Sequence, residues 1–277
     1  VMEIIKQHLP DDEYKKVETK KSTIILHHTA GGHRPDWTIT AWDTDKRGAV
    51  GTQYVLGGKS ITNGDTSFDG KLYEALDPKY WIHHLGCETY NNTILNQQAV
   101  AIEICNYGYV TAGKDGKFYN YVNSQVPASD VFTLPTKWKG YNSFQKYTDA
   151  QINTTKEWIK EMATKFGIDC RLGLPALLRD ANQFPTNGTV LDKQKWLNKY
   201  GVSADGAVLS EDGGLGPKTQ AAINIMERFK TEGFQVFFGL NSAALTGKPG
   251  VWTHVNFRSD KSDCHPQPQL IEMLISL

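Results

Sequence analysis

The chain has 277 residues, with 30 lysines and arginines against 30 aspartates and glutamates, so its formal net charge is zero. This balance gives no overall field that would attract nucleic acid or an anionic membrane, and we expect neither as a partner. No run approaches the ~18 apolar residues of a membrane span, and the first residues lack the apolar stretch of a secretory signal. The four cysteines have no CxxC spacing, which indicates free thiols rather than a disulfide scaffold.

Strand and helix signals alternate along the chain. Short apolar and β-branched runs bounded by Gly, Asn and Asp predict strands over 23–27, 52–56, 71–75 and 99–105. The clearest helix begins at Thr148, where TDAQ is a capping box, and apolar residues then follow a 3.6-residue period until Gly167. Residues 111–146 are rich in Gly, Tyr, Asn, Pro and Lys, which predicts an irregular excursion. The alternation favours an α/β fold.

Two adjacent histidines, His27 and His28, end the first predicted strand. Side chains alternate along a strand, so we expect one of the two to point toward a chemical site and the other toward packing. Near the end of the chain, another short apolar run ends in His254, and a polar loop then delivers Cys264. Two imidazoles and a thiolate suit a zinc ion that keeps its fourth position for water. The same residues also fit two structural histidines and a free thiol.

Six segments come in an order that resembles the type 2 N-acetylmuramoyl-L-alanine amidases, zinc enzymes related to the peptidoglycan recognition proteins. The segments are IILHHTA, GTQYVLGG, HHLG, AVAIEICN, YTDAQINTTKEWIKEMATKFGI and THVNFRSDKSDCHP. The resemblance covers residues 22–168 and 250–275 and implies a central mixed β-sheet flanked by helices. It also implies bound Zn²⁺ and hydrolysis of the amide between N-acetylmuramic acid and L-alanine in peptidoglycan.

Metal ligands and a general base can be carried over from the resemblance. It implies His27, His254 and Cys264 as the zinc ligands, with Asp263 as a substitute because some family members use Asp. Glu103 matches the carboxylate that takes a proton from water and returns it to the departing amine. The alternative for this glutamate is a surface position on an edge strand, although its apolar neighbours favour a central strand.

Three further positions bear on the mechanism that the resemblance implies. His84 matches a histidine near the active cleft, and both a substrate-binding or oxyanion-stabilising role and simple packing stay open. The family places a lysine two residues before the third ligand; counted from Cys264 that position is Ser262, so Lys261 is either an oxyanion partner or a solvated lysine. Thr52 stands where some members carry a tyrosine, which places this chain in the branch that uses a glutamate.

A long stretch separates the predicted helix from His254, where the family has a short connection. Within it, KQKWLNKYGVSADGAVLSEDGGLGPKTQAAINIM resembles a peptidoglycan-binding repeat, and it also fits a helical insertion that shapes one wall of the cleft. We therefore expect an N-terminal extension over 1–21 and an amidase domain in two parts, 22–182 and 231–277. A small inserted helical subdomain would span 183–230.

The sequence thus predicts a monomeric zinc hydrolase that degrades bacterial peptidoglycan, as a bacteriolytic phage endolysin or a bacterial autolysin with antimicrobial action. Without a visible signal peptide, it fits an endolysin made in the host cytoplasm and acting on the cell wall. A rival from another class is a non-catalytic peptidoglycan recognition module, against which the presence of Cys264 argues. A second rival is a zinc hydrolase that acts on another amide.

Overall fold

A six-stranded mixed sheet forms the centre of the computed structural model, which describes residues 3–46, 48–88 and 91–277. Its strands, in the order β1-β4-β3-β5-β2-β11, are β1 (Ile4–Lys6), β4 (Leu72–Glu74), β3 (Tyr54–Leu56), β5 (Ala99–Ile104), β2 (Thr23–His28) and β11 (Gly250–Thr253). Strands β3, β5, β2 and β11 run parallel, whereas β3 and β4 are antiparallel. The predicted α/β fold with a central mixed sheet is confirmed.

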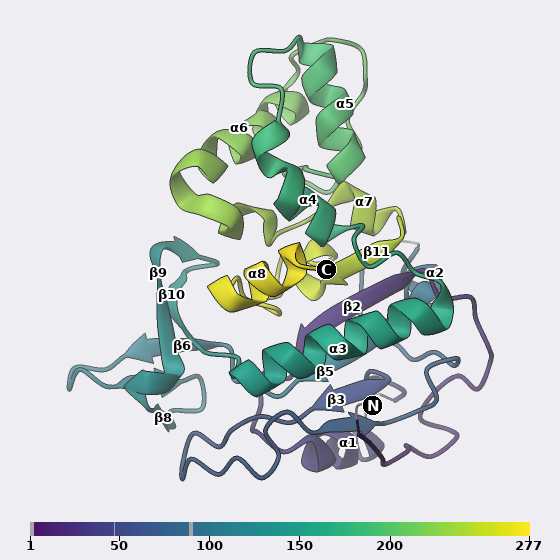
Figure 1. The fold of residues 1–277 in the computed structure, drawn as a ribbon, viewed down its shortest axis with the longest axis vertical. Helices are drawn as coiled ribbons and strands as arrows, with labels where there is room; N and C mark the ends of the chain where they lie inside the picture. Colours follow the sequence, from purple (N-terminus) through teal and green to yellow (C-terminus); the bar gives the residue numbers. More distant parts are fainter. Residues whose placement is uncertain (1–2, 47, 89–90) are drawn as a thin grey trace.

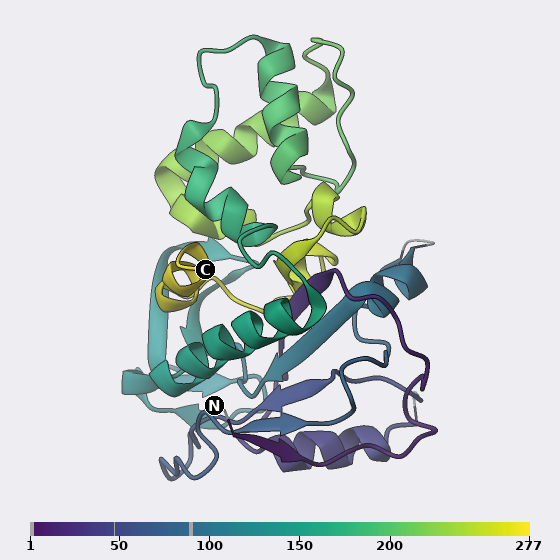
Figure 2. The ribbon, with the colours of Figure 1, turned by 45° about the vertical axis from the view of Figure 1, so that its right-hand side comes forward.

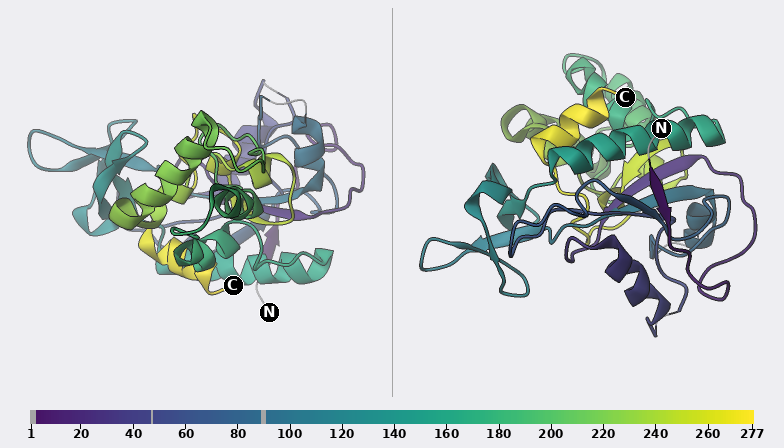
Figure 3. Two further views of the ribbon diagram at one scale, coloured as in Figure 1. Left: turned by 90° about the horizontal axis from the view of Figure 1, so that it is seen from above. Right: turned by 60° about the horizontal axis from the view of Figure 1, so that its bottom comes forward.

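Helices cover both faces of this sheet (Figure 3). Helix α1 (Pro35–Asp43) lies on one face, and α3 (Asp149–Phe166) with α8 (Pro268–Ile275) lies on the other. Covering both faces explains why β2 is buried along its whole length and is apolar until its two histidines. The capping box that begins α3 is present, because Thr148 accepts from the Gln151 backbone N–H and Gln151 accepts from the Thr148 backbone N–H.

A second, antiparallel sheet projects from the body of the molecule (Figure 1). Its strands, in the order β8-β7-β6-β10-β9, are β6 (Tyr109–Ala112), β7 (Phe118–Asn120), β8 (Gln125–Val126), β9 (Val131–Trp138) and β10 (Tyr141–Gln145). The prediction of an irregular excursion over 111–146 is therefore wrong. The glycines and asparagines that suggested it occupy tight turns between short strands; Gly116, Asn123 and Gly140 all have positive φ.

Helices gather at one end of the molecule, beyond β11 (Figure 2). They are α4 (Leu174–Asp180), α5 (Val190–Tyr200), α6 (Pro217–Glu232) and α7 (Ser242–Leu245). The remaining helical segments are α2 (Asn92–Gln98), η1 (Ala128–Asp130), η2 (Ala181–Gln183), η3 (Gly233–Phe237) and η4 (His254–Asn256). Buried side chains of this helical end, such as Leu197 and Met226, belong to the same hydrophobic cluster as β2 and β5. None of the helices in the described ranges is both long and apolar enough to span a membrane.

Candidate metal centre and catalytic cavity

Strands β2 and β5 bring His27 and Glu103 onto one face of the sheet. The two residues are direct partners in the parallel pairing of these strands, so their side chains leave the sheet on the same side. Both line a cavity of about 340 Å³. Three other predicted site residues, His84, His254 and Lys261, line it as well. Elements that are far apart in the sequence therefore converge on one cavity.

One carboxylate oxygen joins the two histidines that were predicted as metal ligands. Asp263 Oδ2 lies 3.2 Å from His27 Nδ1 and 2.9 Å from His254 Nδ1. The three side chains are buried, and their ligand atoms lie within 4.8 Å of one another. Two imidazole nitrogens and one carboxylate oxygen form a ligand set that zinc accepts in catalytic sites. The arrangement could therefore hold a zinc ion.

Hydrogen bonds on the far side of each imidazole orient it toward the centre of the cluster. His254 Nε2 lies 2.8 Å from the Leu85 carbonyl oxygen, which can only accept, so this nitrogen carries a proton. In a neutral ring, Nδ1 then presents a lone pair to the Asp263 carboxylate. His27 Nε2 lies 2.9 Å from His84 Nδ1. This contact holds the His27 ring from its far side, as the Leu85 carbonyl holds the His254 ring. In this tautomer, two lone pairs and a carboxylate face one another, and a metal ion could bind between them.

Electrostatics of the cluster agree with a cation site. Burial alone would raise the pKa of Asp263, but its contacts with the neighbouring His254 and His27 side chains hold it well below its usual range. Burial and the neighbouring His254 lower the pKa of His27 to about 4, so its ring is neutral at pH 7. A neutral imidazole and an ionised carboxylate are the forms that bind metal.

Cys264, the ligand that the resemblance favoured, does not lie with the two histidines. Its side chain is fully buried beside Tyr147. Burial and the charge of Asp263 raise the pKa of this thiol well above its usual range, which disfavours the thiolate that a metal needs. Asp263, considered in the sequence as a substitute, takes the place beside the histidines. Lys261 then stands two residues before the third ligand, which is the family spacing.

Glu103 meets the requirements of a general base. Its Oε2 is buried and has no hydrogen-bond partner among the described residues. Burial, reinforced by the charge of Asp263 and opposed by Lys261, raises the pKa of this carboxyl well above its usual range. A raised pKa makes the ionised carboxylate a stronger base, and a carboxyl inside a cavity is placed to accept and release a proton.

His84 lines the cavity and also contacts His27, one of the candidate metal ligands. With the His27 Nε2 proton donated to it, His84 Nδ1 accepts, and its Nε2 is buried without a partner among the described residues. Asn96 Oδ1 accepts from the backbone N–H groups of His84 and Leu85, which fixes this segment. Thr52, in contrast, is buried and donates to the Tyr54 carbonyl oxygen, so its hydroxyl serves the backbone.

The Tyr147 hydroxyl connects the two segments that carry the ligand cluster, which are β2 and the loop that contains Asp263. The Tyr147 hydroxyl lies 2.8 Å from His28 Nδ1 and accepts from the His265 backbone N–H at 3.2 Å. The Gln267 side chain also binds both the backbone N–H and the carbonyl of Tyr147. The His28 ring thus contacts Tyr147, although the residue also lines the cavity that contains His27. Tyr147 carries no signal in the sequence, because no spacing relates it to residues 264–267.

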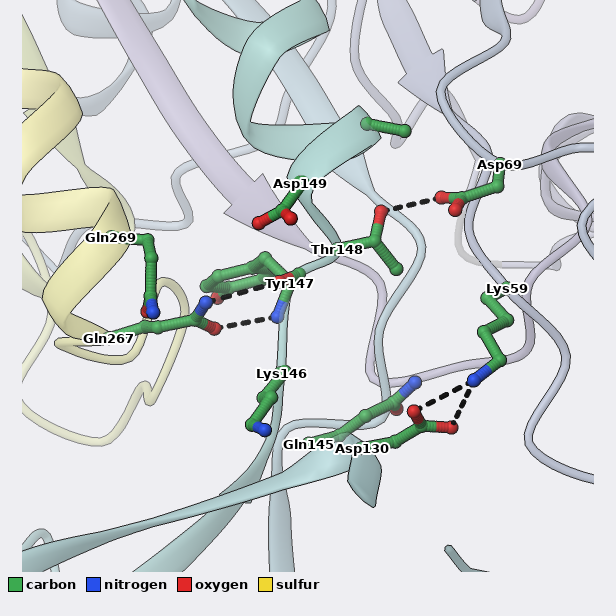
Figure 4. Close-up of a pocket in the computed structure, with 11 residues that line it drawn as sticks. Lys59, Asp69, Asp130, Gln145, Lys146, Tyr147, Thr148, Asp149, Gln267 and Gln269 are labelled. Carbon is green, nitrogen blue, oxygen red and sulfur yellow. Dashed lines mark hydrogen bonds and ion pairs between the residues drawn. The ribbon is translucent and has the colours of Figure 1, made fainter. Parts of the chain in front are cut away.

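A larger cavity, of about 510 Å³, lies at the beginning of α3 (Figure 4). Its polar groups are largely paired with one another. Lys59 donates to both Asp130 oxygens at 2.8 and 3.0 Å, and Asp69 accepts from the Thr148 hydroxyl at 2.6 Å. The predicted catalytic residues do not line this cavity. We therefore assign it no role in the reaction, although it is larger than the cavity that contains His27 and Glu103.

Comparison with known proteins identifies the family. Residues 18–174 match the family model of the N-acetylmuramoyl-L-alanine amidases. The chain therefore belongs to this enzyme family, and the resemblance stated from the sequence is confirmed. The matched segment contains His27, His84 and Glu103 and ends before the part of the chain that carries His254 and Asp263.

Several solved structures of hydrolases are similar to this chain at low identity. A mutant endolysin from Bacillus subtilis is 15% identical, with coverage of 61% of this chain and 80% of that chain and a TM-score of 0.36. The amidase AmiD from E. coli is 17% identical, with coverage of 56% and 48% and a TM-score of 0.34. The Staphylococcus aureus hydrolase AmiA is 9% identical, with coverage of 99% and 81% and a TM-score of 0.41.

A curated protein also matches part of the chain. It is a formamidopyrimidine-DNA glycosylase from Exiguobacterium sp., 26% identical over 108 residues. The alignment covers 37% of this chain, and the chain spans only 38% of the length of that relative.

Proposed function

We propose that this chain is a zinc-dependent amidase that hydrolyses the bond between N-acetylmuramic acid and L-alanine in peptidoglycan. The observation that carries the proposal is the convergence of His27, His254 and Asp263 in one cavity with the partnerless carboxyl oxygen of Glu103. The three ligands would hold the zinc ion. When bound, zinc would polarise the amide carbonyl and lower the pKa of water in this cavity.

The remaining side chains of the cavity supply proton transfer and charge stabilisation. Glu103 takes a proton from the attacking water and gives it to the amine of L-alanine as the C–N bond breaks. Lys261 lines the same cavity and stabilises the negative charge that develops on the carbonyl oxygen. His84 holds the His27 ring in the orientation that turns Nδ1 toward Asp263.

Zinc analysis together with mass spectrometry of digested peptidoglycan tests this function. We expect one zinc per chain, stem peptides with a free L-alanine amine, and glycan strands with a free lactyl carboxyl group. Glu103→Gln serves as the inactive control. Binding to peptidoglycan without these products would instead support the non-catalytic recognition module. Products of a different amide would contradict the proposed substrate bond.

We also propose that the helical segment 183–230 binds the cell wall, in an endolysin or autolysin that works on an insoluble polymer. Val208 and Leu215 in this segment are each 56% exposed, so their apolar side chains are available to contact the polymer. A second attachment point would raise the local concentration of the polymer at the catalytic cavity.

Point substitutions are the suitable test of this second proposal, because other residues of the segment contribute to the shared core. Val208→Ser with Leu215→Ser should weaken pelleting with intact cell walls and leave turnover of a soluble muropeptide unchanged. Val17→Ser, at a position that is 60% exposed outside the segment, is the control. Unchanged pelleting by the double variant would contradict wall binding through this surface.

A further inference from the structure

A second cavity, of about 400 Å³, lies beside the catalytic cavity. Gly32 and Ala41 line the second cavity, whereas Ala30 and Trp42 line the catalytic one. The loop after β2 and the end of α1 therefore form a thin partition between them. Tyr107, which precedes the second sheet, also lines the second cavity.

An exposed indole on α1 forms part of this second cavity. Trp37 lines this cavity and is 65% exposed. Its indole is therefore available to a ligand that enters the cavity. Its ring is nevertheless held in place. The Arg34 guanidinium lies 4.2 Å from the centre of the Trp37 ring and 4.8 Å from the centre of the Phe68 ring, and it pairs with Asp36. Such a fixed aromatic surface costs little entropy when a ligand stacks on it.

Charge in this cavity favours a neutral ligand. The Arg34 cation is compensated by Asp36, and burial lowers the pKa of His33, so its ring is neutral at pH 7. Hydroxyl groups of Ser60 and Thr62 contribute further donors and acceptors. An anionic ligand would require a cation free of its own carboxylate, and the described lining does not offer one. Aromatic faces with hydroxyls suit a ligand that is apolar on its ring faces and rich in hydroxyl and amide groups at its edges.

We propose that this second cavity is a saccharide subsite, which binds N-acetylated sugar rings of the glycan strand whose stem peptide enters the catalytic cavity. The inference rests on the proposed function, because the glycan strand is the part of that substrate on the other side of the scissile amide. Trp37 and Tyr107 supply the surfaces on which sugar rings stack, and the hydroxyl and amide edges bind the neighbouring polar side chains. Cavities of this volume suit ligands of one or a few rings.

Titration of the full chain with a tetramer of N-acetylglucosamine tests the subsite. This probe is neutral and carries no peptide, so its binding requires neither zinc nor catalysis. We expect saturable binding in calorimetry, a loss of at least about tenfold in affinity in Trp37→Ala, and partial retention in Trp37→Phe. Val17→Ala, at a similarly exposed apolar position elsewhere, should bind like the unmodified chain. Absence of binding, or equal affinity in Trp37→Ala, would overturn the proposal.

A comparison of two substrates separates this inference from the proposed function. Trp37→Ala should lower kcat/KM for polymeric peptidoglycan by a larger factor than kcat/KM for a muropeptide with one sugar, because more sugar rings can contact the subsite in the polymer. If the chain binds the oligosaccharide through Trp37 but cleaves neither substrate, the amidase assignment fails and the saccharide site stands. If Trp37→Ala cleaves both substrates at the unmodified rates, the saccharide site fails and the amidase assignment stands.

Discussion

Asp263 and Cys264 are neighbours in the chain, but their side chains enter different parts of the molecule. The Asp263 carboxylate contacts both histidines of the proposed zinc site, whereas the Cys264 thiol is buried beside Tyr147. We expect Asp263→Ala to lose zinc and activity, because it removes one of three ligands. Cys264→Ser should keep zinc content and most of the activity, since it preserves a small side chain with a hydrogen-bonding group.

Zinc affinity measured by competition with a chelator would distinguish the two residues. Asp263→Ala should lower the affinity by at least about 10–100-fold, the range found when even an outer-shell partner is lost. Zinc lost in Cys264→Ser but retained in Asp263→Ala would restore the thiol as the ligand.

Glu103 is expected to act on protons and not on the metal. Glu103→Gln keeps the size of the side chain and removes its ability to accept a proton. We predict an unchanged zinc content and thermal stability, with kcat reduced by roughly 10²–10⁴. Steady-state kinetics on a soluble muropeptide would provide the measurement. A Gln variant with a nearly unmodified rate would transfer the role of base to another group.

Lys21 predicts a pH dependence of stability. The residue is 2% exposed, and burial lowers its pKa to about 7, below the value of about 10.4 expected in the unfolded chain. Between these pH values the unfolded chain binds one more proton than the folded chain, so the free energy of unfolding rises with pH. The rise is at most about 1.4 kcal/mol per pH unit.

Urea unfolding at pH 7, 8 and 9 would reveal this contribution. The rise should be absent from Lys21→Met and present in Lys20→Met, whose side chain is exposed. A Lys21→Met variant with the pH dependence of the unmodified chain would mean that this lysine stays charged throughout, held by its three oxygen acceptors.

At the scale of elements, the site depends on contacts between a strand end, a loop and the beginning of a helix. Tyr147 precedes α3, and its hydroxyl contacts both His28 of β2 and the backbone of His265. Removing this hydroxyl leaves buried polar groups unpaired. Tyr147→Phe should therefore destabilise the protein by about 1–3 kcal/mol and weaken zinc binding.

A matched control for this prediction is Tyr119→Phe, which removes a hydroxyl that binds the exposed Asp115. The control should change stability little, because a surface partner can bind water instead. Thermal unfolding with and without zinc would compare the two variants. Equal, small effects of both substitutions would contradict a connecting role for Tyr147.

At the scale of the whole molecule, the helical end and the sheet share one hydrophobic cluster. Leu197 and Met226 from the helices and Val251 of β11 belong to it, and the Trp138 indole donates to the Phe238 carbonyl oxygen. We therefore predict a single cooperative unfolding transition. Calorimetry should give equal calorimetric and van't Hoff enthalpies.

Segment 183–230 would unfold separately if it were an independent domain. A substitution within it, such as Met226→Ala, should lower the midpoint of the whole transition. Two resolved transitions, of which only one responds to this substitution, would contradict the shared core.

Local patterns in the sequence were sufficient for much of this architecture. The strand that ends in His27 and His28, the central position of Glu103 and the capped helix after Thr148 follow from side-chain periodicity and capping, which act over a few residues. The second sheet was missed because its strands are short and its turns carry most of the local signal.

Only the tertiary structure decided which side chains meet. Whether Asp263 or Cys264 faces His27 depends on how a loop near the end of the chain packs against β2, and a choice between adjacent residues leaves no trace in their spacing. The support of His27 by His84 and the connection through Tyr147 are likewise contacts between segments distant in the chain. Composition and periodicity describe one segment at a time, whereas a metal centre is defined by the distances between several.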